Sequence, residues 1–157
     1  MERPLEAARE SGLVRGGEAL LVLLSGGGDS VALLDIALRL GAEVAALHVN
    51  YGLRDGADED EAFCRALCER LGVGLTAERV TLPEGGNLQD RAREARYALA
   101  ERVAAGDYAA AHTASDQAET VLYRLAVSPG RRALLGMEAR RGRLVRPLLR
   151  VTRPELR

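Results

Sequence analysis

The chain has 157 residues, of which 47% are hydrophobic, and a formal net charge of −1. This length and apolar content suffice for one domain with a buried core, and they exclude a disordered chain. No segment is long and apolar enough to cross a bilayer, and the polar start Met1-Glu2-Arg3-Pro4 lacks the apolar segment of a signal peptide. We therefore expect a cytoplasmic protein with no membrane partner.

Apolar periodicity and breaks at glycine and proline predict that strands and helices alternate along the chain. A short amphipathic helix is expected over residues 3–13. The predicted strands cover residues 20–24, 43–49, 74–82 and 108–111, and the helices that follow them cover residues 29–40, 58–71, 88–105 and 115–126. Cys64 and Cys68 lie one helical turn apart, which favours two small buried side chains over a disulfide or a zinc pair.

Repeated strand–helix units are typical of an α/β fold with three layers, in which helices cover both faces of a parallel sheet. In such sheets, ligands bind outside the carboxyl ends of the strands. Three segments lie at the ends of predicted strands: Ser25 to Ser30, His48 to Arg54, and His112 to Asp116. The sequence therefore predicts that these segments converge on one crevice.

The first of these segments, Ser25-Gly26-Gly27-Gly28-Asp29-Ser30, leads from a buried strand into a helix. Glycines at a helix N-terminus let backbone N–H groups face an anion, so phosphate is the expected ligand. A Walker loop is excluded because the chain contains no lysine. A dinucleotide loop is excluded because Asp29-Ser30 stands where its third glycine belongs.

The side chains of this loop suit a phosphate with a metal ion. Ser25, Ser30 and the loop amides can hold pyrophosphate, whereas Asp29 beside a phosphate implies that Mg²⁺ lies between the two anions. The alternative is a glycine-rich turn in which Ser25 or Asp29 only caps the helix.

A second group of polar residues, His112, Asp116 and Glu119, lies at the last predicted strand-to-helix turn. Asp116 and Glu119 are three residues apart in a first helical turn, so their carboxylates share one helix face. We expect both carboxylates to face the crevice and His112 to donate a hydrogen bond to a phosphoryl oxygen. The alternative is that the two acids only complement the helix dipole and that His112 is a packing residue.

Charge is unevenly distributed along the chain. Residues 131–157 contain nine arginines and two glutamates, which gives this segment a net charge of +7 and leaves −8 for residues 1–130. A basic segment on an acidic body is compatible with nucleic acid bound near the C-terminal end. A solvated or partner-facing tail is the alternative.

Several motifs together resemble the tRNA(Ile)-lysidine synthetases, a family of the N-type ATP pyrophosphatase or PP-loop superfamily. In chain order they are Ser25 to Ser30, His48 to Arg54, Ala92 to Tyr97, His112 to Thr120, Gly136-Met137, and Arg146 to Leu149. The resemblance covers residues 20–149. The first motif is shared with the wider superfamily, and the others are more specific to this family.

The resemblance implies a ligase that joins free L-lysine to C2 of the wobble cytidine in a tRNA(Ile) with a CAU anticodon. ATP would adenylate the C2 carbonyl oxygen with release of pyrophosphate, and the lysine amine would then displace AMP. The ATP-binding residues implied are Ser25, Gly26, Gly27, Gly28, Asp29, Ser30 and His48.

The resemblance also implies individual roles. Asp29 would be the ligand of Mg²⁺, and Arg93 and His112 would contact the phosphates. Asp116 and Glu119 would hold the lysine substrate. Arg96 stands on the same predicted helix face as Arg93, so either arginine fits the phosphate contact.

By this resemblance, residues 1–130 form a PP-loop ATP pyrophosphatase catalytic domain and residues 131–157 a basic extension that begins a tRNA-recognition region. Val127-Ser128 stands where the family usually has Arg-Gly. A homodimer is left open. Two alternatives to the lysidine synthetases are another PP-loop enzyme, such as a tRNA thiolase or an NAD or GMP synthetase, and an ATP-binding module without catalysis.

Overall fold

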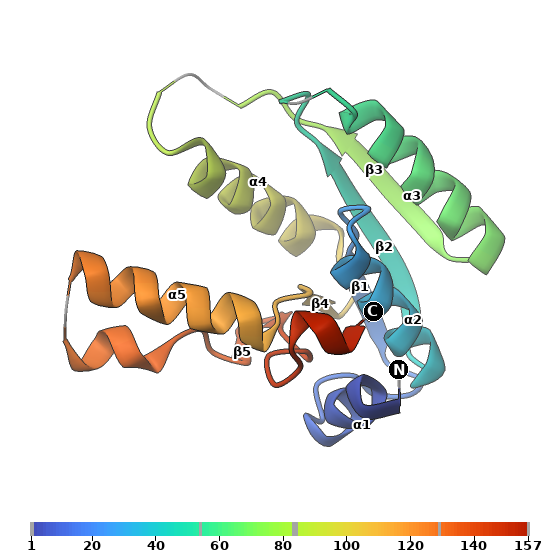
Figure 1. Ribbon diagram of the computed structural model, residues 1–157. Coiled ribbons are helices and arrows are strands. Elements are labelled where there is room, and N and C mark those ends of the chain that lie inside the picture. Colours follow the sequence, from blue (N-terminus) through green and yellow to red (C-terminus); the bar gives the residue numbers. More distant parts are fainter. Residues whose placement is uncertain (1, 54, 83–84, 129, 157) are drawn as a thin grey trace.

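The computed structural model of the chain describes residues 2–53, 55–82, 85–128 and 130–156. Strands and helices alternate as the sequence predicts (Figure 1). The helices are α1 (Glu2–Glu10), α2 (Gly28–Arg39), α3 (Ala57–Leu71), α4 (Leu88–Val103) and α5 (Ala114–Val127), with the 3-10 turns η1 (Arg131–Leu135) and η2 (Arg153–Leu156). The strands are β1 (Ala19–Leu23), β2 (Glu43–Asn50), β3 (Gly74–Arg79), β4 (Asp107–Ala109), β5 (Arg140–Arg141) and β6 (Leu144–Val145).

Two predicted elements end three residues earlier than the sequence suggests. The first helix ends at Glu10 because the Ser11 hydroxyl donates to the carbonyl of Ala8 over 2.6 Å and Gly12 turns the chain with a φ of 65°. β3 ends at Arg79 because its partner strand β2 ends opposite it, at Asn50.

The six strands lie in the order β3-β2-β1-β4-β6-β5, and all of their pairings are parallel except that between β5 and β6. β1 is flanked by β2 on one side and by β4 on the other. The chain thus builds the sheet outward from β1 in both directions, and ligand sites in such sheets lie at the carboxyl end of the strand where the order reverses. The loop from Ser25 to Ser30 occupies this position.

Alternate residues of β1 pack on opposite faces of the sheet. Leu20 and Val22 belong to a core cluster that includes residues of α1, α2 and α3, whereas Leu21 and Leu23 belong to a second cluster that includes Leu99 of α4. Helices therefore cover both faces, with α2 and α3 on one side and α4 on the other (Figure 1). This arrangement confirms the predicted three-layer α/β fold.

Helix α5 begins at the sheet and extends away from it together with η1 (Figure 1). None of its described residues is buried. Gln117 ties the returning chain to this helix, because its Nε2 donates to the carbonyl of Met137 over 2.8 Å and its Oε1 accepts from the N–H of Met137 over 2.5 Å. We call α5 and η1 the α5 arm. The backbone of the motif residues Gly136-Met137 thus fixes the chain that follows η1 to α5.

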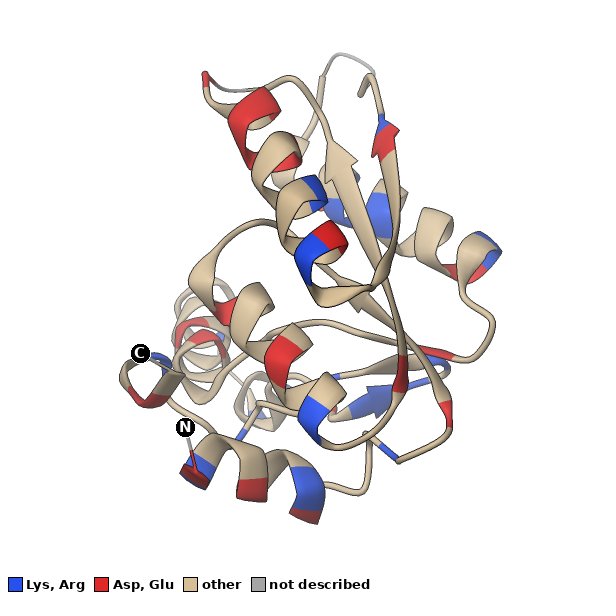
Figure 2. Ribbon diagram, turned by 90° about the vertical axis from the view of Figure 1, so that its right-hand side faces the viewer, with Lys and Arg blue, Asp and Glu red and all other residues tan. Residues whose placement is uncertain are grey.

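The segment after the arm returns to the sheet and to the core. β6 pairs with β4, and Leu148, Val151 and Leu156 belong to the same core cluster as Leu20. An ion pair between Arg3 and Glu155 joins α1 to η2, and these two elements lie close together in Figures 1 and 2. Residues on both sides of position 130 therefore contribute to one sheet and one core.

Cys64 and Cys68 are free and buried, as predicted. Burial raises the pKa of the Cys64 thiol to about 11. Within the described ranges, no helix combines the length and the apolar character that crossing a bilayer requires.

The start of β4 approaches β1 so closely that a side chain has no room there. A Cβ on Gly106 would lie 2.4 Å from the backbone oxygen of Ala19, so we expect Gly106→Ala to lower the free energy of unfolding by about 1–3 kcal/mol. Gly74→Ala is the matched control, because a Cβ on Gly74 meets no atom within 4 Å. Urea unfolding of both variants tests this expectation, and equal losses of stability would contradict it.

Candidate functional site

The loop after β1 is held in shape by its own serine hydroxyls. The Ser25 N–H donates to the Ser30 hydroxyl oxygen over 3.2 Å, and the two hydroxyl oxygens are 3.1 Å apart. The Ser30 hydroxyl donates in turn to the carbonyl of Gly27 over 2.8 Å. Gly26 has a φ of 86°, in the left-handed region that favours glycine. The loop therefore depends on both serines and on this glycine for its conformation.

Helix α2 begins at this loop without a side-chain cap. Its N-cap residue is Gly27, in an extended conformation, and the Ser25 hydroxyl accepts from the N–H of Gly27 itself over 3.3 Å. Among the described residues, neither Ser25 nor Asp29 accepts from the helix N–H groups that follow Gly27, as the capping alternative requires. The first amides of an uncapped helix need partners, and together with the helix dipole they favour an anion.

A cavity lies against this uncapped helix end and brings together residues that are distant in the sequence. It is lined by Leu23, Ser25, Gly27, Gly28, Asp29, Ser30, Arg96, Ala110, Ala111, His112, Asp116, Arg153 and Leu156. The predicted convergence of the first and third segments is thus confirmed. We call this space the loop cavity.

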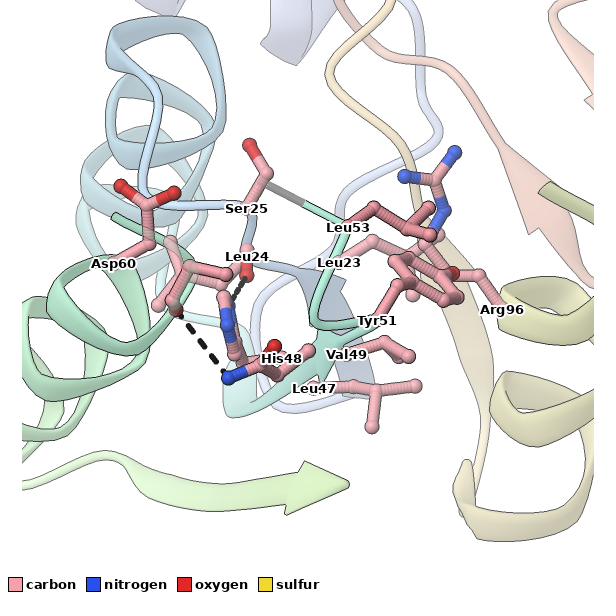
Figure 3. Close-up of a pocket in the computed structure, with 12 residues that line it drawn as sticks. Leu23, Leu24, Ser25, Leu47, His48, Val49, Tyr51, Leu53, Asp60 and Arg96 are labelled. Atoms are coloured by element: carbon pink, nitrogen blue, oxygen red, sulfur yellow. Dashed lines mark hydrogen bonds between the residues drawn. The ribbon is translucent and has the colours of Figure 1, made fainter. Parts of the chain in front are cut away.

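A second cavity shares Leu23, Ser25 and Arg96 with the loop cavity and extends along the end of β2 (Figure 3). Its other lining residues include Leu47, His48, Val49, Tyr51, Leu53 and Asp60. The predicted second segment therefore lies beside the first, up to Leu53. Arg54, the last residue predicted for that segment, lies outside the described residues.

His48 gives the second cavity a polar group between apolar walls. Its Nδ1 lies 2.9 Å from the carbonyl oxygen of Leu24. Because a carbonyl only accepts, Nδ1 carries the proton and Nε2 is left as an acceptor. Nε2 is buried and has no hydrogen-bond partner among the described residues. A largely apolar slot with a few polar groups at its edge suits a flat heteroaromatic ring such as adenine.

The two arginines that fit the predicted phosphate contact differ in position. Arg96 lines both cavities, and its buried Nε has no hydrogen-bond partner in the described part of the chain. Figure 3 shows its side chain beside Tyr51, across the second cavity from Asp60. Arg93 instead forms an ion pair with Asp90 of the same helix at 2.5 Å, and its side chain is 54% exposed. Arg96 is the better placed of the two for an anion in the loop cavity.

His112 is held by a buried arginine. Arg146 Nε donates to His112 Nδ1 over 3.2 Å, and Arg146 Nη1 donates to the carbonyl of Glu138 over 2.7 Å. Burial, followed by the charge of Arg146, lowers the pKa of His112 to about 4. The ring is therefore neutral near pH 7 with its proton on Nε2, which leaves that nitrogen as a hydrogen-bond donor.

Asp116 uses its two oxygens for different partners. Oδ2 accepts from the N–H and the hydroxyl of Thr113 over 2.8 and 2.7 Å, which completes a capping box at the start of α5. Burial tends to raise the pKa of Asp116, but the bonds from Thr113 and the charge of Arg153 outweigh it and lower that pKa. Asp116 is therefore a carboxylate near neutral pH, with only Oδ1 left for a partner in the cavity.

Arg153 lies between the two groups of acids that the sequence singles out. Its guanidinium is 2.6 Å from Asp116 Oδ1, 3.2 Å from Asp29 Oδ2 and 3.6 Å from Glu119 Oε1. Asp29 and Asp116 line the loop cavity, whereas the Glu119 side chain is 69% exposed and meets the site through this arginine. Sequence patterns do not indicate this contact, because 124 residues separate Arg153 from Asp29.

The donor set at the loop fits a magnesium ion that arrives with a nucleotide. No group of three or more histidine, cysteine, aspartate or glutamate side chains in the described ranges could hold a metal ion by itself. Mg²⁺ commonly binds through one or two carboxylates together with substrate phosphates and water. Asp29, next to the uncapped amides of α2, suits such a shared site.

The sequence matches a protein family described as the PP-loop domain over residues 2–157. Proteins described as tRNA(Ile)-lysidine synthase are similar over most of the chain. The relative from Thermus thermophilus is 44% identical over 149 aligned positions, and the match covers 89% of this chain and 29% of that protein. The relative from Pseudomonas aeruginosa is 43% identical, over 86% of this chain and 33% of that protein. The chain thus spans about a third of the length of these curated relatives.

Solved structures with the same fold include a U34-tRNA thiolase from Methanococcus maripaludis, with a TM-score of 0.75 and 19% identity over 99% of this chain and 60% of that one. An NMN synthetase from Francisella tularensis matches with a TM-score of 0.62 and 17% identity over 99% of this chain and 65% of that one. At these identities, the likeness concerns the fold alone.

The lowered pKa of His112 predicts how stability depends on pH. Between about pH 6.5 and 4 the unfolded histidine takes up a proton that the folded one does not, so stability is lost as the pH falls. The slope from one such group is at most about 1.4 kcal/mol per pH unit. His112→Gln keeps an acceptor for Arg146 and should flatten this slope in urea unfolding measured across the window. An unchanged slope would contradict the assigned state of His112.

Proposed function

The chain belongs to the PP-loop domain family, and on this basis we propose that it carries out the ATP-dependent ligation of lysine to the wobble cytidine of tRNA(Ile). One observation carries the proposal: the uncapped N-terminus of α2, Asp29, His112 and Asp116 line one cavity. Relatives described as tRNA(Ile)-lysidine synthase, 37–44% identical over most of the chain, support the choice of substrate. Free L-lysine and a tRNA with a CAU anticodon are the proposed substrates, and a homodimer stays a prediction.

The first proposed step is transfer of AMP to the cytidine. The C2 carbonyl oxygen attacks the α-phosphorus of ATP, a new P–O bond forms, and the bond to pyrophosphate breaks. Negative charge develops on the departing pyrophosphate, and hydrogen-bond donors fixed beforehand around it lower the barrier. The amides at the start of α2, Arg96 and the Nε2 proton of His112 are the donors that line this cavity.

Mg²⁺, when bound, would neutralise phosphate charge, and Asp29 is the residue that would hold it. Asp29 follows directly on the N-terminal glycine of α2, so its carboxylate and the helix amides address the same phosphates. An acid at an anion site is unfavourable unless a cation separates the two charges. The adenine ring is assigned to the second cavity, which His48 helps to line.

The second proposed step is attack by the lysine side chain. The bound ammonium first loses a proton to water, the neutral ε-amine adds to C2, the bond from C2 to the AMP oxygen breaks, and the nitrogen then loses a second proton to water to complete the product. Asp116 and Glu119 are the proposed binding groups for the incoming ammonium form, because paired carboxylates stabilise a cation. Asp116 lines the loop cavity, and Glu119 lies one helical turn further along α5, where both carboxylates contact Arg153.

The thiolase alternative is less well supported by the residues of this chain. The two cysteines both lie on α3, and Cys64 Sγ lies 3.4 Å from His48 Nδ1 in a buried position. Burial keeps this thiol protonated, which disfavours a role as nucleophile or ligand. The paired acids of α5 have no evident use in sulfur transfer.

The central test is formation of AMP and pyrophosphate that depends on both lysine and tRNA. Asp29→Asn should lower kcat/KM for ATP by about a hundredfold or more, since it removes the charge that would hold Mg²⁺. Asp35→Asn is the matched control, because Asp35 lies on the same helix in an exposed ion pair with Arg39. Labelled lysine that never enters a CAU-anticodon tRNA with the wild-type protein would refute the proposed activity.

A second test separates the two arginines of α4. Arg96→Gln should raise the KM for ATP by about tenfold, because a charge-assisted bond to phosphate contributes about 1.5–3 kcal/mol. Arg93→Gln removes an exposed pair of small energetic value and should change the KM by less than about threefold. Steady-state kinetics of both variants decide between them, and a larger effect at Arg93 would restore the assignment made from the sequence.

A further inference from the structure

The guanidinium of Arg153 occupies the place where the proposed function needs the amine of the substrate. It contacts Asp116 and Glu119, the two carboxylates assigned to lysine, and also Asp29. Thr113 already engages Asp116 Oδ2, so Oδ1 is the oxygen that faces both Arg153 and an incoming ammonium. Two cations on one oxygen would lie within a few ångströms of each other and repel. Lysine and Arg153 therefore compete for Asp116.

The backbone around Arg153 is anchored, so that release of the acids requires movement of the side chain alone. The N–H of Arg153 donates to the Ser115 hydroxyl over 3.2 Å, and Glu155 accepts from both the N–H and the hydroxyl of Thr152 over 2.7 Å. Leu156 belongs to the core. The Arg153 side chain itself is 38% exposed, and it has several rotatable bonds with which to reorient.

The loop cavity offers the guanidinium a second type of partner. Arg153 lines this cavity together with Gly27 and Gly28 at the uncapped start of α2. A phosphate group bound there would meet Arg153 directly, and guanidinium binds phosphate through paired, charge-assisted hydrogen bonds. A bound triphosphate adds charged oxygens to the three carboxylates that pair with Arg153, so it should draw the guanidinium towards itself.

We propose that Arg153 couples the two substrate sites: it holds Asp116 and Glu119 until the phosphates of ATP attract its guanidinium, and lysine then binds to the released carboxylates. The inference rests on the proposed function for the identity of the amine. It adds that ATP binds before lysine. It also adds Arg153, on η2, to the residues that contact phosphate.

The test is the affinity for lysine, measured by calorimetry on the whole chain with and without Mg²⁺ and a non-hydrolysable ATP analogue. In the wild-type protein, the analogue should tighten lysine binding by about tenfold or more, within the usual range of coupling between sites. In Arg153→Gln, lysine should bind equally well in both conditions, and the analogue should bind more weakly than in the wild type.

Arg140→Gln is the matched control, because Arg140 makes a two-point ion pair with Asp107 and lines neither cavity. In this variant the analogue should still tighten lysine binding by about tenfold.

Each outcome decides the proposal. If the wild-type protein attaches lysine to tRNA but binds lysine equally well with and without the analogue, the coupling is refuted and the proposed function stands. If the wild-type protein binds no lysine in either condition, both fall. Coupling that survives in Arg153→Gln also refutes the role of this residue. If that variant does not fold, Arg153→Lys, which keeps one charge but cannot bridge three acids, should show a reduced coupling.

Discussion

The first amides of helix α2 have no side-chain cap, and the chain is arranged so that this helix end faces a cavity. Glycine at the N-cap leaves room beside the backbone, and the hydroxyls of Ser25 and Ser30 bond to each other and to the N–H and carbonyl of Gly27, not to the N–H groups of the helix residues that follow. This end follows β1, the strand from which the chain adds β2 and β3 on one side of the sheet and β4 on the other. His112, Asp116 and Arg153 line the same cavity as this helix end.

The segment after the α5 arm completes both the core and the site. β6 extends the sheet next to β4, and Val151 and Leu156 bury η2 against the face that carries α1 and α2. This packing brings Arg153 over the carboxylates and Arg146 against His112. Some of the arginines near the C-terminal end therefore bind groups of the site itself: Arg153 pairs with its acids and Arg146 bonds to His112. These arginines are not simply a surface for a polyanion.

Local patterns in the sequence predicted the fold and the convergence of the strand ends, because buried strands, helix stripes and glycine breaks are short-range signals. They missed β5 and β6, whose two residues each are too few for a pattern. They also missed Arg153 and the choice between Arg93 and Arg96, because both depend on how distant segments pack. The lowered pKa of His112 likewise arises from burial against Arg146, a contact 34 residues away in the chain.

Binding of an anion at the start of α2 can be tested by adding pyrophosphate with Mg²⁺ and following individual backbone amides by ¹⁵N NMR. If the uncapped helix end binds this anion, the largest shifts should fall on the amides of residues 26–29, with little change at Gly72, the glycine that ends α3. Shifts spread over the arginine-rich surface, or none at residues 26–29, would contradict the account.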